Sequence, residues 1–223
     1  MWPNTEIYHM NISHNKVAIS TTLLTLLMMI VLLTFSSSLA RTGQQSDMHS
    51  DVHLTVGDPA PEFEAMTDEG EVWRSADHDG GILVVFFFPA AMTGGCTAQA
   101  CSFRDNRTKL VDMGAEVVGI SGDQIRNLQI FRATNNLNFP LLSDAEGSIA
   151  RAFGVPVRDG GTITREVDGE QVELTRNVTT ARWTFIIDED GNIAYIDTEV
   201  QADVDSEAVI AAIAEMTGTQ ERH

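Results

Sequence analysis

Both cysteines of this 223-residue chain, Cys96 and Cys101, lie in one short stretch, and no other residue type here is better suited to redox chemistry. Ahead of them, Ile82–Phe88 is an unbroken apolar run of strand length, and the segment Thr97–Asp112 has the pattern of a helix. Cys96 is therefore predicted to lie where a buried strand gives way to a helix N-terminus. The first N–H groups of a helix lack internal partners and the helix dipole is positive there, so this position favours a thiolate over a thiol.

The segments around this stretch alternate between strand and helix patterns. Predicted strands are Glu71–Trp73, Ile82–Phe88, Glu116–Ser121, Trp183–Ile187 and Ile193–Ile196, and predicted helices are Thr97–Asp112, Gln124–Asn135, Glu146–Phe153 and Ser206–Met216. Asp123 and Asp144 precede two of these helices and are expected to cap them. Strands interleaved with helices predict an α/β fold whose sheet is covered on both faces.

One segment departs from this alternation. Thr162–Val167 and Gln171–Leu174 flank Asp168-Gly169, a dipeptide that tolerates positive φ at both positions. The pattern predicts a β-hairpin inserted at the edge of the domain. A second hairpin turn is expected at Asp190-Gly191, where the neighbouring acidic residues lack the later carboxylate of a calcium loop. No metal site is predicted.

The first forty residues have the composition of an export signal. Lys16 precedes the apolar run Leu23–Leu33, and Ser38-Leu39-Ala40 offers small residues where a signal peptidase would cleave. We predict a signal peptide over residues 1–40 and an exported, periplasmic or extracytoplasmic, domain. The alternative is an uncleaved membrane anchor over Val17–Phe35, with the domain facing outward.

The rest of the chain divides into a linker and one domain. Residues 41–56 are polar and lack periodicity, which is typical of a flexible linker, and residues 57–217 carry the alternating strands and helices.

The formal charge of −18 arises from 32 acidic residues against 14 lysines and arginines. Such a surface repels nucleic acids and anionic membranes, so neither is an expected partner of the domain.

The residues before the cysteine helix match a family motif. Pro89, Thr93 and Cys96 have the spacing P-x-x-x-T-x-x-C, and in this respect the chain resembles the peroxiredoxins, specifically their bacterioferritin-comigratory, or Q-type, branch. The resemblance extends from about Val56 to Met216, and its other parts are Val56–Phe63, Cys101–Asp105 and Ala181–Phe185. The chain departs from the Q-type pattern at Gly94, where that branch usually has proline, and in the length of the predicted hairpin.

The resemblance implies a thioredoxin-like fold with a central mixed sheet, and a thiol-dependent peroxidase that reduces hydrogen peroxide and organic hydroperoxides. Cys96 would be the peroxidatic nucleophile, and Cys101 would resolve its sulfenic acid as an intramolecular disulfide. Arg182 would supply positive charge to the thiolate and the departing oxygen. Thr93 would accept the hydroperoxide proton while its hydroxyl donates to sulfur or oxygen, and Pro89 would shield the sulfenic acid from water.

Further residues and partners follow from the same resemblance. The backbone amides of Gly95 and Cys96 would add donors to the substrate, and Gln99, one turn beyond Cys96, would help to order the site. No cofactor is expected. The partners would be a hydroperoxide and a thioredoxin-like or other thiol reductant, and the protein would be a monomer or weak dimer.

Two other classes of function share some of these features. An exported thioredoxin-like thiol-disulfide oxidoreductase would need C-x-x-C spacing, whereas four residues separate Cys96 from Cys101. A non-catalytic domain could hold the two cysteines as a structural disulfide. Against the second alternative, Arg182 lies in an apolar stretch beside Trp183 and Phe185, where an arginine needs an anionic partner.

Overall fold

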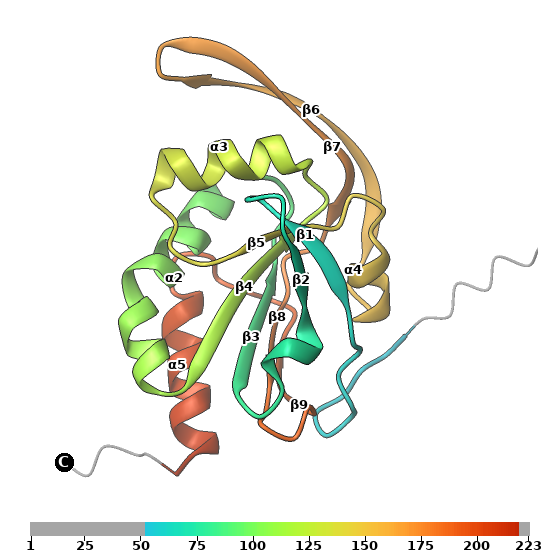
Figure 1. Ribbon diagram of the computed structural model, residues 1–223, viewed down its shortest axis with the longest axis vertical. Coiled ribbons are helices and arrows are strands. Elements are labelled where there is room, and N and C mark those ends of the chain that lie inside the picture. Colours follow the sequence, from blue (N-terminus) through green and yellow to red (C-terminus); the bar gives the residue numbers. More distant parts are fainter. Residues whose placement is uncertain (1–51, 219–223) are drawn as a thin grey trace, which may run out of the picture. The chain divides into compact units, whose positions relative to one another are not determined.

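A computed structural model of the protein describes residues 52–218. The strands are β1 (Glu64–Thr67), β2 (Val72–Arg74), β3 (Ile82–Phe87), β4 (Ala115–Ser121), β5 (Leu141–Ser143), β6 (Val157–Val167), β7 (Glu170–Thr180), β8 (Thr184–Ile187) and β9 (Ile193–Asp197). The helices are α2 (Gly94–Asp112), α3 (Ile125–Asn135), α4 (Ser148–Ala152) and α5 (Asp205–Met216), with a 3-10 turn, η1, at Ser75–His78. In this part of the chain seven strands form one sheet in the order β2-β1-β5-β4-β3-β8-β9, and β6 and β7 pair with each other (Figure 1).

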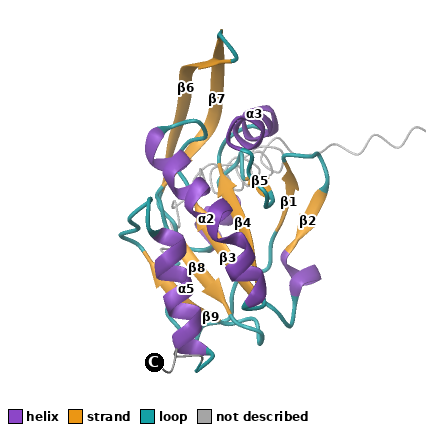
Figure 2. Ribbon diagram, turned by 90° about the vertical axis from the view of Figure 1, so that its left-hand side faces the viewer, coloured by secondary structure: helices purple, strands orange, loops and turns teal. Residues whose placement is uncertain are grey.

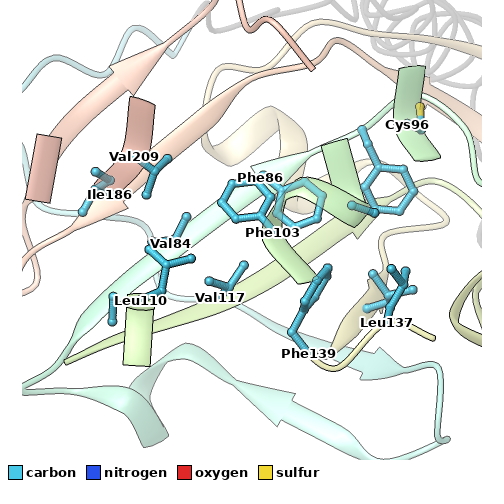
Figure 3. Close-up of a cluster of buried hydrophobic side chains, with 14 of the residues drawn as sticks. Val84, Phe86, Cys96, Phe103, Leu110, Val117, Leu137, Phe139, Ile186 and Val209 are labelled. Carbon is cyan, nitrogen blue, oxygen red and sulfur yellow. The ribbon is translucent and has the colours of Figure 1, made fainter. Parts of the chain in front are cut away.

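Strand β3 lies inside the sheet and all six of its residues are buried, which explains why its sequence is apolar without interruption. It pairs in parallel with β4 and antiparallel with β8, so the sheet is mixed, as predicted. Successive side chains of a strand point to opposite faces, and accordingly Val84 and Phe86 enter one apolar cluster while Val85 and Phe87 enter the other. Side chains of α2 and α5 join the first cluster (Figure 3), as do Leu128 and Phe131 of α3, and side chains of α4 join the second. The predicted α/β fold with helices on both faces is confirmed.

The cysteine helix α2 begins at Gly94, three residues earlier than the sequence indicated. Thr93 precedes it with an extended backbone, φ −101° and ψ 148°. Both cysteines therefore lie within one continuous helix, which runs beside α5 (Figure 2). Cys96 and Phe103 project from α2 into the first apolar cluster together with Phe86 (Figure 3).

The inserted hairpin is confirmed and is longer than predicted. Each of its strands has 11 residues, and both turn residues have positive φ, 53° at Asp168 and 85° at Gly169. Figure 1 shows the hairpin extending past α3. Near its base, Asn177 N–H donates to Gly122 O at 3.3 Å, and Gly122 directly follows β4 of the sheet. A Cβ on Gly122 would lie only 2.3 Å from the Val178 carbonyl oxygen, so this close approach requires glycine.

Several boundaries were missed or displaced. Strands β1 and β5, of four and three residues, were not predicted. Asp144 acts as expected near a helix start, accepting the N–H groups of Ile149 and Ala150.

The predicted leader, residues 1–40, and most of the predicted linker lie outside the described residues. Among residues 52–218, no helix has the length and apolar character needed to cross a bilayer.

Candidate active site

Cys96 is the third residue of α2 and is 1% exposed. The first helical hydrogen bond here runs from Thr97 N–H to Thr93 O, at 2.8 Å. The preceding amides, those of Gly94, Gly95 and Cys96, are the ones that an α-helix leaves without internal partners. The thiol therefore lies beside the positive end of the helix dipole, as the sequence predicted.

Arg182 reaches this thiol from the segment that precedes β8. Its Nη2 donates to Cys96 Sγ at 3.4 Å, and its Nη1 donates to Gln99 Oε1. A Cβ placed on Gly95 would lie 3.2 Å from Arg182 Nη2, so glycine leaves room for the guanidinium. The structure thus brings together four of the predicted site residues, from α2 and from the segment before β8.

Thr93 lies at the start of α2, but its hydroxyl differs from expectation. Its Oγ1 donates to Ala90 O at 2.8 Å and forms no capping bond to the helix. The hydroxyl proton is therefore engaged, and the expected donation to sulfur or oxygen is not present. The lone pairs of Oγ1 remain on the oxygen as acceptors for a proton delivered by a ligand.

The loop from Pro89 to Thr93 is held by two residues that the sequence did not identify. The carboxylate of Asp123, 1% exposed, accepts the Ala91 N–H at 2.8 Å instead of capping α3 as expected. Arg165, on the inserted hairpin, donates from Nε to Met92 O at 2.8 Å. Because β3 and β4 are parallel neighbours, the residues after both strands meet at one sheet edge, which is a signal that could have placed Asp123 beside the loop.

A third missed residue is Asp205, the first residue of α5. It is 2% exposed, and its Oδ2 accepts from Gln99 Nε2 at 2.7 Å and from Thr184 Oγ1 at 2.8 Å. Burial raises the pKa of this carboxyl to about 6, although both hydrogen bonds act in the opposite direction. Arg182 therefore belongs to a polar chain that begins at Cys96 and ends at α5.

Cys101 lies five residues beyond Cys96 on the same helix, and both cysteines are free thiols. On a regular helix two α-carbons with this separation are about 8 to 9 Å apart, beyond the reach of a disulfide. Cys101 is half-buried, whereas Cys96 is buried. The pKa of Arg104, one turn beyond Cys101, is raised by its hydrogen bond to Asp105 and further by the neighbouring Cys101.

A cavity of about 320 Å³ opens beside Pro89 and Arg182. Its other walls come from the base of the inserted hairpin, where Val157 and Arg158 lie on β6. Its lining is more apolar than polar and includes two arginines, Arg158 and Arg182. Arg182, which donates to Cys96 Sγ, thus also lines this cavity.

The fold and the site define a thioredoxin-like protein with a buried cysteine at a helix N-terminus beside an arginine, and comparison with known proteins is consistent with that class. A model of the AhpC/TSA family matches residues 56–196, and the chain belongs to this family. It is 37% identical to peroxiredoxin Bcp of Escherichia coli K12 over 143 residues, 64% of this chain and 85% of that protein. The protein is accordingly a thiol-dependent peroxidase of the Bcp and peroxiredoxin Q branch.

Solved structures give the same assignment. The crystal structure of peroxidoxin BcpB from Mycobacterium tuberculosis is 32% identical, with a TM-score of 0.61, and the match covers 74% of this chain and 99% of that one. The bacterioferritin comigratory protein of Xanthomonas campestris is 26% identical with a TM-score of 0.57, and covers 69% of this chain and 91% of its own.

The predicted export of the domain is wrong. The relatives include Bcp proteins of Coxiella burnetii and Escherichia coli and a rice protein whose name assigns it to the chloroplast, and none of these three names describes an exported protein. The expectation rested on the apolar run Leu23–Leu33 and the small residues after it. A short apolar run is a compositional signal, and it does not by itself specify export or an outward-facing anchor.

Proposed function

We propose that Cys96 is the peroxidatic nucleophile of this enzyme. Its thiolate attacks one oxygen of a hydroperoxide, so an S–O bond forms, the O–O bond breaks, and the second oxygen leaves as an alcohol or water after taking a proton. Cys96 is thereby oxidised to a sulfenic acid. The observation that carries this proposal is the 3.4 Å contact between Arg182 Nη2 and Cys96 Sγ at the N-terminus of α2.

Each neighbouring group has a role in the proposed step. Arg182 and the amides of Gly95 and Cys96 stabilise the thiolate and the negative charge that develops on the departing oxygen. Thr93 accepts a hydrogen bond from the protonated oxygen of the hydroperoxide, a role supported by the engagement of its own proton with Ala90 O. Pro89 covers the thiol without offering an N–H that would hold water.

We propose that Cys101 resolves the sulfenic acid. Its thiolate attacks Cys96 Sγ, the S–S bond forms, the S–O bond breaks, and the oxygen leaves as water after protonation. Because the regular helix keeps the two cysteines apart, the first turns of α2 must unwind before the bond forms. A dithiol protein of the thioredoxin type then reduces the disulfide by exchange.

The substrates of this proposal are hydrogen peroxide and organic hydroperoxides. The cavity of about 320 Å³ beside Pro89 and Arg182 supports the second class, since it offers an apolar wall to an alkyl substituent. The work on the Xanthomonas campestris relative concerns its alkyl peroxide reduction activity, which supports the same class.

The proposal is tested by the intact mass of the reduced full-length protein after one equivalent of hydrogen peroxide. Wild type should lose two hydrogens, Cys101→Ser should gain one oxygen or link to a second chain, and Cys96→Ser should remain unchanged. If Cys96→Ser is oxidised as fast as wild type, the assignment of the nucleophile is wrong. If peroxide leaves wild type unchanged while the protein still reduces disulfides, the alternative of a thiol-disulfide oxidoreductase holds.

A further inference from the structure

A chain of buried hydrogen bonds connects the first residue of α5 to Arg182. Gln99 donates from Nε2 to Asp205 Oδ2 at 2.7 Å, and Oε1 of the same amide accepts from Arg182 Nη1. Thr184 Oγ1 donates to the same carboxylate oxygen at 2.8 Å. Gln99 is 0% and Asp205 2% exposed, so water does not compete for these bonds.

The hydrogen-bonding capacity of each group fixes the direction of the chain. A guanidinium only donates, an ionised carboxylate only accepts, and an amide does both. With Asp205 ionised, Gln99 must turn its NH₂ group toward α5 and its oxygen toward Arg182. The reversed amide would bring two donors together at Arg182 and two acceptors together at Asp205, and burial makes both arrangements unfavourable.

We propose that Asp205 is a positioning residue for peroxide reduction: its carboxylate fixes the amide of Gln99, and this amide holds Arg182 against Cys96 Sγ. The inference rests on the roles proposed above for Cys96 and Arg182. Asp205 acts through Gln99, because the hydrogen bonds of its carboxylate go to Gln99 and Thr184. Its second oxygen, Oδ1, is buried and receives no donor from the described residues.

Titration of Asp205 should change this arrangement. Burial raises its pKa to about 6, within reach of physiological conditions. The charged and titratable groups that face it are Arg182 from the segment before β8, and Asp197 and Tyr195 from β9, while α2 presents the neutral Gln99 and, beyond Arg182, Cys96. A protonated carboxyl can also donate, so it accepts either orientation of the amide. Asp205 should therefore hold Gln99 and Arg182 in place fully at about pH 7.5, and this effect should decrease toward about pH 5.

The test measures the rate at which hydrogen peroxide oxidises Cys96 in the reduced full-length protein, by quenched reaction and mass, between about pH 5 and about pH 8. Asp205→Asn keeps the shape of the side chain and removes the acceptor-only character. Asp203→Asn is the matched control, since Asp203 is an exposed acid on the same approach to α5. Arg182→Ala tests separately whether Arg182 is needed for the reaction of Cys96 with peroxide.

At about pH 7.5, Asp205→Asn should react about fivefold to tenfold more slowly than wild type, the range expected for the net loss of one hydrogen bond. The ratio of the two rates should fall toward one at about pH 5, because Asp205 is then protonated in wild type. Asp203→Asn should follow wild type. A rate within twofold of wild type at about pH 7.5, or a ratio independent of pH, overturns the inference. If Arg182→Ala also reacts at the wild-type rate, the proposed site fails as well.

A double variant reverses the direction of the hydrogen bond between positions 99 and 205. It distinguishes loss of this bond from a general loss of structure. In the double variant Gln99→Glu with Asp205→Asn, the carboxylate at position 99 accepts from Arg182 and from the amide at position 205, whose oxygen still accepts from Thr184. The double variant should react faster than either single variant. A double variant no faster than the slower single one contradicts the proposed direction of the chain.

Discussion

Replacing Asp205 by asparagine should stabilise the reduced protein by an amount that grows with pH. The pKa of Asp205 rises from 3.8 to about 6 on folding, chiefly through burial. A raised pKa means that the folded protein binds this proton more tightly than the unfolded chain. The stability that the neutral carboxyl supplies is therefore complete below about pH 4, decreases as the pH rises, and is lost above about pH 6. Asparagine does not titrate in this range, so it keeps that stability.

The size of the effect follows from the shift. A change of roughly two pKa units corresponds to about 3 kcal/mol between the protonated and ionised forms. The side chain is 2% exposed, so solvent screening does not reduce this value substantially. On the order of 1 to 2 kcal/mol of it should appear between about pH 5 and about pH 7. That interval lies above the isoelectric point of about 4.5, where a strongly acidic protein keeps its solubility.

The assay is urea unfolding of reduced full-length wild type and Asp205→Asn at several pH values in that interval. The difference between the two proteins cancels the titration of the groups that they share. Asp203→Asn removes an exposed charge nearby and should give a small difference that is the same at every pH. A difference for Asp205→Asn that is constant across the interval, or that shrinks as pH rises, would refute the reasoning.

Three further outcomes are expected. Thr93→Ser should retain most of the peroxide rate, whereas Thr93→Val should lose about tenfold to a thousandfold, since the acceptor oxygen is removed; equal rates would leave Thr93 without a chemical role. Val157→Trp should fill the cavity beside Arg182 and slow cumene hydroperoxide at least several-fold more than hydrogen peroxide in parallel kinetic assays; equal slowing would separate the cavity from substrate binding. Amides of Gly94–Phe103 should lose hydrogen-exchange protection on oxidation and regain it on reduction; unchanged protection in a protein shown by mass to contain the disulfide would contradict unwinding of α2.

The parts of the site that the sequence predicted are those fixed by local pattern. The apolar run of β3 and the helix after Cys96 place the thiol at a helix N-terminus, and Asp168-Gly169 specifies the hairpin turn. Arg182 was predicted from the resemblance of Ala181–Phe185 to the arginine-bearing strand of the family, and its place in an apolar stretch supported an anionic partner.

The parts that were missed depend on contacts between residues far apart in the chain. Asp205 is 106 residues from Gln99, and Arg165 is 73 residues from Met92. Nothing in the local sequence distinguishes Asp205 from the exposed acids around it. Its role arises only from its burial and its hydrogen bond to Gln99 on α2. The export prediction failed in a similar way, because the apolar run Leu23–Leu33 carries no information about what it contacts.

Gln99 lies between the two cysteines on α2. The two steps of the proposed cycle therefore require opposite states of this part of the helix. Reaction with peroxide needs an ordered helix, because only there does the amide of Gln99 join Asp205 to Arg182. Disulfide formation needs the same turns to unwind, because Cys101 cannot reach Cys96 on a regular helix. In the proposed cycle, formation of the disulfide therefore breaks the hydrogen bonds of Gln99 and releases Arg182. The oxidised site is then disassembled, and it is rebuilt only when reduction lets α2 wind again. The ionised Asp205 lowers the stability of the fold near neutral pH, yet as a pure acceptor it selects the amide orientation that this rebuilding requires.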